Sequence, residues 1–200
     1  MIDAFECVRM FERSLAGYTG AKYAVAVNSG TAALKLATKM WNGTSSVTIP
    51  SRTYRSVWQV LLDNLYTVKF RDYEWDECYQ IEPTNVWDYA LVTLDENIYV
   101  PGTVQCLSFH PQKALALSSG GGAILHDNDD LDEWYRWQRW DGRTEGVAIQ
   151  EDELRDGEHV YMFPGQAGEA LHKLNIYATR GPVKIPHPNY ENLEKKVIHG

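Results

Sequence analysis

The sequence predicts an α/β fold with a mainly parallel sheet and helices on both faces. Short, continuously apolar runs of the kind found in buried parallel strands alternate with segments whose apolar residues recur at helical spacing. Such alternation is typical of strands joined by helical crossovers. With 200 residues, 44% of them hydrophobic, the chain is long enough for one sizeable core.

The alternation is clearest in the N-terminal part of the chain. Helical spacing of apolar residues predicts a helix over residues 2–16, and the apolar run Tyr23–Val27 predicts a buried strand. The elements expected next are a helix that reaches Trp41, a strand over Ser46–Ile49 that Pro50 ends, a helix that carries Val57, Trp58, Leu61 and Leu62, and a strand over Tyr66–Phe70.

The remainder of the chain is less regular. Residues 71–87 are acidic, aromatic and without a clear period. Strands are expected over residues 89–94, 103–109 and 122–125, and helices over 131–140 and 166–174. Residues 181–188 are rich in proline and extended. We therefore expect one domain over residues 1–180 and a C-terminal tail over residues 181–200.

Composition argues against several classes of protein. A net charge of -8 disfavours a nucleic-acid partner. No stretch has the length of a membrane span, and the N-terminus lacks the apolar core of a signal peptide. Cys7, Cys78 and Cys106 lie far apart, so they give neither a metal-ligand spacing nor a disulfide framework. We expect a cytoplasmic protein that binds neither metal nor membrane.

A turn of small residues, Asn28-Ser-Gly-Thr-Ala-Ala33, joins the strand at Tyr23–Val27 to the helix that follows. Its backbone N–H groups carry little side-chain bulk, and the positive end of the helix dipole points at them, which favours a phosphate. An ordinary serine or threonine N-cap explains the same residues. The segment alone does not separate these two interpretations.

A lysine follows the strand expected at residues 103–109. In Ser108-Phe-His-Pro-Gln-Lys113 the lysine lies between a proline turn and the glycines Gly120–Gly122. If this position is partly buried, desolvation lowers the pKa of the ammonium and makes Lys113 a nucleophilic amine. For a lone lysine, an exposed loop residue is the commoner outcome.

The order of these signals resembles the DegT/DnrJ/EryC1/StrS family of pyridoxal-phosphate-dependent sugar aminotransferases. The resemblance covers roughly residues 5–175 and is strongest at Phe11–Leu36 and Ser108–Asp127, with a weaker match at Gln166–Leu174. It implies the large domain of the fold type I transferases, which resemble aspartate aminotransferase. It also implies pyridoxal 5'-phosphate (PLP) as the cofactor.

The resemblance implies a role for each candidate residue. Lys113 would hold PLP as a Schiff base and then move a proton as general base. The remaining roles are phosphate binding by Gly30, Thr31, Ala32 and Ser108, ring stacking by Tyr54, and pairing of Asp95 with the pyridine nitrogen. An exposed acid at a strand end is the alternative for Asp95. His110 and His159 are expected to be structural or solvent-facing.

The chain also departs from the family pattern. It is shorter than family members, and we expect it to lack the C-terminal small domain as well as a strand–helix unit between Phe70 and Asp95. Because Lys113 is retained, the dehydratase branch, which has histidine there, is disfavoured.

Three functions remain open. The first is amino transfer from an amino acid, with glutamate as the expected donor, to a keto-sugar nucleotide by a homodimer. The second is a weakly active or inactive domain that binds the cofactor or a nucleotide sugar, or that serves as a partner subunit. The third is a purely structural or interaction protein.

Overall fold

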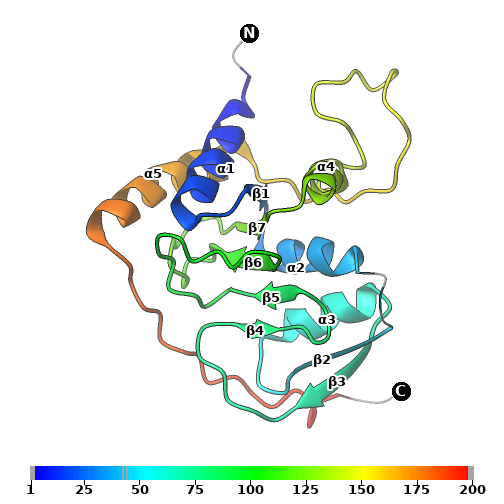
Figure 1. Cartoon of the computed structure of the whole chain (residues 1–200), viewed down its shortest axis with the longest axis vertical. Helices are drawn as coiled ribbons and strands as arrows, with labels where there is room; N and C mark the ends of the chain where they lie inside the picture. The colour runs from blue at the N-terminus through cyan, green and yellow to red at the C-terminus, as the bar shows by residue number, and fades with distance from the viewer. Residues whose placement is uncertain (1–2, 42, 44, 198–200) are drawn as a thin grey trace.

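A computed structural model describes residues 3–41, 43 and 45–197, and Figure 1 shows how their elements are arranged. A five-stranded sheet has the order β1-β7-β6-β5-β4, and β2 and β3 form a separate pair. The strands are β1 (Tyr23–Val27), β2 (Ser46–Pro50), β3 (Thr67–Arg71), β4 (Tyr79–Gln80), β5 (Val86–Asp88), β6 (Val104–Ser108) and β7 (Gly122–His126). The helices are α1 (Glu6–Thr19), α2 (Gly30–Lys39), α3 (Arg55–Asp63), α4 (Asp129–Gln138) and α5 (Pro164–Arg180).

The fold class is α/β, as the sequence predicts, but the sheet is mixed rather than mainly parallel. β5 and β6 are parallel, as are β2 and β3. The pairs β1–β7, β6–β7 and β4–β5 are antiparallel. Parallel neighbours need a crossover of a dozen or more residues. The connection from β4 to β5, residues 81–85, is too short for such a crossover, and it returns the chain antiparallel.

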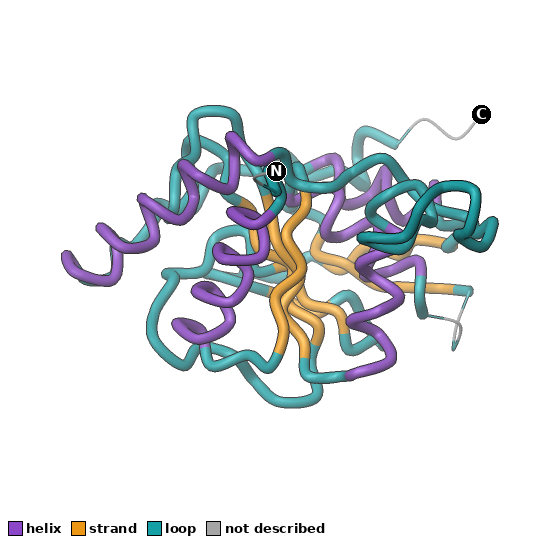
Figure 2. Tube along the Cα trace, turned by 90° about the horizontal axis from the view of Figure 1, so that it is seen from above, coloured by secondary structure: helices purple, strands orange, loops and turns teal. Residues whose placement is uncertain are grey.

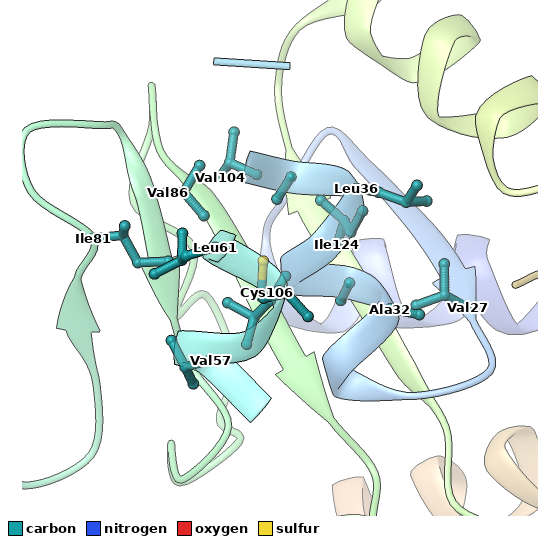
Figure 3. Packing of buried hydrophobic residues seen from close by; sticks show 14 of the residues in the cluster. Val27, Ala32, Leu36, Val57, Leu61, Ile81, Val86, Val104, Cys106 and Ile124 are labelled. Atoms are coloured by element: carbon teal, nitrogen blue, oxygen red, sulfur yellow. The ribbon is translucent and has the colours of Figure 1, made fainter. Parts of the chain in front are cut away.

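Helices cover both faces of the sheet (Figure 2). On one face α2 and α3 pack on the strands, and Figure 3 shows Leu36 and Leu61 from these helices close to Cys106 and Ile124. On the other face α1 and α5 bury Phe11, Leu15 and Leu174. Because both faces are covered, alternate residues of β1 enter opposite cores and the strand is apolar throughout.

Most expected elements are found, with shifted ends. β1 has the predicted bounds, while α5 runs to Arg180, beyond the predicted end. The strand predicted over residues 89–94 is wrong. The chain leaves the sheet at Asp88, where Ala90 N–H donates to Asp88 Oδ1, and residues 89–103 form a loop.

The predicted tail folds back over the molecule. Its described residues, 181–197, form neither helix nor strand and run past β4 towards the β2–β3 pair (Figure 1). Leu193 N–H donates to the carbonyl of Ser51 at 2.8 Å, and Lys184 pairs with Asp76. Residues 198–200 of the tail and Ile2 of the predicted first helix lie outside the described residues.

Candidate functional site

The carboxyl ends of three strands meet at one edge of the sheet. β1 and β6 both run antiparallel to β7, so they run in the same direction, and β5 is parallel to β6. Across this edge Val27 pairs with Gly122, which pairs in turn with Ser108. Ligands of α/β sheets bind beyond such carboxyl ends. The edge therefore gathers the turn before α2, Ser108 and Asp88.

The turn before α2 is held unusually close to β6. A Cβ atom at Gly30 would lie 2.7 Å from Ser108 Cβ and 3.0 Å from Ser108 Oγ. A Cβ atom at Gly122 would lie 2.5 Å from the Ser29 carbonyl carbon. Since real Cβ atoms do not approach so closely, both positions require glycine. This packing brings the Ser108 hydroxyl against the first turn of α2.

The helix N-terminus offers polar groups that suit an anion. Ser29 is the N-cap, and its Oγ accepts the Ala32 N–H at 3.1 Å. The N–H groups of Gly30 and Thr31 lie in the same first turn, where backbone N–H groups have no acceptor inside the helix. Thr31 is exposed and its hydroxyl donates to Ser56 Oγ at 3.0 Å. The N-cap interpretation is confirmed, and the remaining groups fit a phosphate.

Lys113 lies in the loop between β6 and β7. Its backbone N–H donates to the His110 carbonyl at 2.8 Å, and Leu117 N–H donates to the Phe109 carbonyl at 2.9 Å. The side chain is half-buried. Burial lowers the pKa of the Lys113 ammonium, and the nearby Asp88 carboxylate opposes this shift. The environment thus favours the free amine, as the sequence predicts for a desolvated lysine.

The structure brings Asp88, rather than Asp95, to this lysine. Asp95 is exposed in the loop after β5, and its charge acts on Tyr18 and Tyr177 instead. Asp88 ends β5 and is 5% exposed. Burial raises the pKa of its carboxyl, while the Ala90 N–H, Tyr79 and Lys113 lower it in part. The placement of Asp95 at a strand end is therefore wrong, because the strand ends at Asp88.

Aromatic side chains from three segments stand around the site. Tyr54, at the N-cap of α3, is 57% exposed. Its ring centroid lies 6.4 Å from that of Tyr190 in the C-terminal segment, and Tyr190 stacks on Trp75 at 6.0 Å. Burial, then Asp88, raises the pKa of Tyr190 to about 12. Sequence reasoning missed Trp75 because residues 71–87 showed no period, and Asp88 because the strand was expected only after it. Tyr190 was missed because it lies in the stretch expected to be a tail.

The two histidines singled out from the sequence are both exposed. His159 Nδ1 lies 2.8 Å from Asp141 Oδ2, and His110 Nδ1 accepts the Gln112 N–H at 3.3 Å. Within the described part of the chain, no three His, Cys, Asp or Glu side chains gather as metal ligands would. Among the same residues, no helix has the length and apolar character needed to cross a membrane.

A model of a known protein family matches the N-terminal part of the chain. Residues 2–93 match the profile of the DegT/DnrJ/EryC1/StrS aminotransferase family. The resemblance to this family is confirmed. No curated protein matches the sequence.

Solved structures, one of them titled as a member of this family, share the fold. A DegT DnrJ EryC1 StrS aminotransferase from Brucella abortus is 20% identical, with a TM-score of 0.69 over 85% of this chain and 58% of that one. AtS13 from Actinomadura melliaura is 17% identical, with a TM-score of 0.75 over 84% of this chain and 59% of that one. NtdA from Bacillus subtilis, solved with bound cofactor PMP, is 17% identical, with a TM-score of 0.69 over 86% and 48%.

At these identities the likeness establishes the fold, which is that of the PLP-dependent transferases of fold type I. The chain spans 48 to 59% of the length of these three structures.

Proposed function

We propose that this chain is a PLP-dependent aminotransferase-like protein that moves an amino group from an amino acid, with glutamate as donor, to a keto-sugar nucleotide. The observation that carries the proposal is the convergence of Lys113, Asp88 and the Gly30–Ser108 contact at one sheet edge. One amine, one buried carboxylate and one anion site are the three groups that PLP requires from a protein.

The anion site would hold the cofactor phosphate. Gly30 and Thr31 supply backbone N–H groups, Thr31 and Ser108 supply hydroxyls, and the helix dipole adds a positive end. Ala32 contributes differently from the expectation, since its N–H already serves the Ser29 cap and its side chain is buried. Ala32 therefore shapes the turn from the core side.

Lys113 and Asp88 would act on the two ends of the cofactor ring. Lys113 would hold the cofactor through its amine, and the lowered pKa of that amine favours both this role and later transfer of a proton. Asp88, in place of Asp95, would pair with the protonated pyridine nitrogen. Bound in this way, PLP supplies an electron sink for a substrate carbanion. The exposed Tyr54 ring is the candidate for stacking on the pyridine.

The assembly proposed for this activity is a homodimer in the cytoplasm, with small-molecule substrates only. Light scattering tests the assembly, and a mass near twice 22.8 kDa is the expected result. A monomer mass at all concentrations would remove the homodimer from the proposal.

A cofactor-binding domain or partner subunit with little turnover is the second candidate. The specific observation in its favour is the C-terminal segment, which places Tyr190 near both Tyr54 and Asp88. A ring in that position competes with substrate for the space around Tyr54.

The first experiment tests the cofactor. Purified protein mixed with PLP should develop a visible absorbance band, and borohydride reduction should attach the cofactor to the peptide that contains Lys113. Lys113→Ala should lose both signals. Lys69→Ala, a change at an exposed lysine of β3, is the matched control and should keep them. Equal spectra for wild type and Lys113→Ala would reject the PLP proposal.

The second experiment tests turnover. Glutamate added to the loaded protein should convert the cofactor to its amino form, and a keto-sugar nucleotide should reverse the conversion. A loaded protein that ignores amino donors would exclude the aminotransferase and leave the binding role.

A further inference from the structure

Asp88 is held by partners on both carboxylate oxygens. Oδ1 accepts the Ala90 N–H at 2.9 Å, and Oδ2 accepts the Tyr79 hydroxyl at 2.8 Å. Tyr79 lies directly opposite Asp88 in the antiparallel β4–β5 pair, so the two side chains leave the same face of the sheet. The tyrosine is 3% exposed.

A third hydroxyl sets the direction of these hydrogen bonds. Thr53 Oγ1 lies 2.6 Å from the Tyr79 hydroxyl oxygen, in a buried contact. An ionised carboxylate only accepts, so the single phenol proton of Tyr79 is given to Asp88 and Thr53 must donate to Tyr79. Burial, then Asp88, raises the pKa of Tyr79, which keeps this proton in place.

The hydrogen bonds from Thr53 to Tyr79 and from Tyr79 to Asp88 join three separate segments of the protein. Thr53 precedes Tyr54 in the turn after β2, Tyr79 is in β4, and Asp88 ends β5. Trp75 packs against the Tyr79 ring, with centroids 4.7 Å apart and planes at 65°. The phenol is therefore held by packing as well as by its two hydrogen bonds.

We propose that Tyr79, oriented by Thr53, is a positioning residue that fixes the plane of the Asp88 carboxylate and keeps it ionised for a cationic ring nitrogen. This inference rests on the proposed function, in which Asp88 pairs with the pyridinium of PLP. Two donors occupy one lone pair on each oxygen, and the remaining lone pairs stay available. A buried carboxylate without such donors would take up a proton and lose its charge.

Few other groups compete for control of Asp88. The charge of Asp88 acts on the pKa of several neighbouring groups, or their charges act on its pKa. These groups are Tyr79 from β4, Cys106 from β6, Cys78, Tyr190 of the C-terminal segment and Lys113. Of these groups Lys113 alone carries a positive charge, and condensation with an aldehyde would alter that charge. Tyr79 is then the lasting side-chain donor.

The apo protein allows a test that does not depend on PLP. Carbon-13 NMR of the Asp88 carboxyl should give a pKa about one unit or more higher in Tyr79→Phe than in wild type, because a donor to the charged form is lost. Thr53→Val should raise the pKa less, and Thr53→Ser, which keeps the hydroxyl, should restore the wild-type value. These variants keep the test decisive if Tyr79→Phe does not fold.

The matched control is Tyr66→Phe. Tyr66 is also buried, and its hydroxyl oxygen lies within hydrogen-bond distance of the carbonyl oxygens of Thr38 and Trp41, at 2.7 and 2.8 Å, within a different part of the fold. Its loss should disturb stability without moving the Asp88 pKa. An equal shift in Tyr66→Phe and Tyr79→Phe would overturn the inference.

Cofactor affinity gives the second measurement. At pH values below the Asp88 pKa of both proteins, the dissociation constant of PLP should be about tenfold higher in Tyr79→Phe than in wild type, and the loss should shrink as pH rises through the elevated Asp88 pKa. A loss of affinity that is the same at every pH would mean a structural role only and would overturn the inference. If wild type binds no PLP, the proposed function fails and the NMR titration alone decides whether Tyr79 controls Asp88.

Discussion

Glu169 of α5 holds the loop that follows Lys113. Its Oε1 accepts the Ser118 N–H at 2.9 Å, its Oε2 accepts the Ser118 hydroxyl at 2.7 Å, and Lys173 lies 2.9 Å away. The Ser118 N–H, then Lys173 and the Ser118 hydroxyl, lower the pKa of Glu169 to about 2. A single carboxylate thereby ties α5 to the β6–β7 loop.

Replacing this carboxylate should destabilise the protein in a pH-dependent way. We expect Glu169→Gln to lower the free energy of unfolding by about 1–3 kcal/mol at pH 7, the usual contribution of hydrogen bonds to a charged group. Because the folded pKa lies below the ordinary value of 4.5, the contribution is complete above pH 4.5 and declines as pH falls towards 2.

Urea unfolding of both proteins between pH 7 and pH 3 measures this difference. Glu133→Gln, at an exposed position of α4, is the control and should track wild type closely. A Glu169→Gln deficit that does not diminish in acid would show that the carboxylate charge is not what stabilises the loop.

At the scale of elements, the contact between α2 and β6 depends on one missing methyl group. A Cβ atom at Gly30 would lie 2.7 Å from Ser108 Cβ, so Gly30→Ala must push the helix and the strand apart. We expect a loss of about 1–3 kcal/mol in stability, the usual cost of overpacking. We also expect weaker binding of PLP, because the Ser108 hydroxyl moves away from the helix N-terminus.

Gly17→Ala is the matched control in another helix. A Cβ atom at Gly17 meets nothing within 4 Å, so this change should stabilise α1 by about 0.5–1 kcal/mol. Thermal unfolding and a PLP titration of the two variants measure both effects. Gly30→Ala with wild-type stability and affinity would contradict the close packing of α2 on β6.

At the scale of the whole molecule, a buried ion cluster links α1, β1 and α4. Glu12 and Arg139 are each 4% exposed. The Glu12 carboxylate accepts hydrogen bonds from the guanidinium groups of Arg139 and, at 2.8 Å, of Arg136. It also accepts the Ala26 N–H at 2.8 Å. Burial alone raises the pKa of Glu12, but Arg139 and Arg136 outweigh burial and hold the pKa below its ordinary value.

Breaking this cluster should be costly because it leaves Arg139 buried without its counter-charge. We expect Glu12→Gln to lower the free energy of unfolding by about 3 kcal/mol or more. Glu6→Gln, on the exposed side of the same helix, should have little effect. Chemical denaturation measures both, and equal effects would contradict the importance of the buried pair.

Local sequence patterns predicted the N-terminal elements well. An unbroken apolar run such as Tyr23–Val27 has few alternatives to a buried strand, and a turn of small residues before α2 marks a helix start. The direction of the Lys113 pKa shift was also predictable, since the flanking proline and glycines place the lysine in a tight loop.

The same patterns did not predict the strands in the irregular part of the chain. β4 and β5 have two and three residues, too few for a period to be seen, so the strand was placed after Asp88 and the acid at its end was taken to be Asp95. The mixed sheet was missed for a related reason. Strand direction depends on the length of the connections, and β4 and β5 had not been recognised.

The sequence by itself determined the α/β class, the turn of small residues at Ser29–Ala32 that starts a helix and the lysine in its loop, because these depend on residues that are neighbours in the chain. Only the tertiary structure decided that Asp88 faces Lys113, that Tyr79 and Thr53 hold Asp88, and that Tyr190 returns to Tyr54. Those contacts join segments far apart in sequence, and strand register and core packing bring them together.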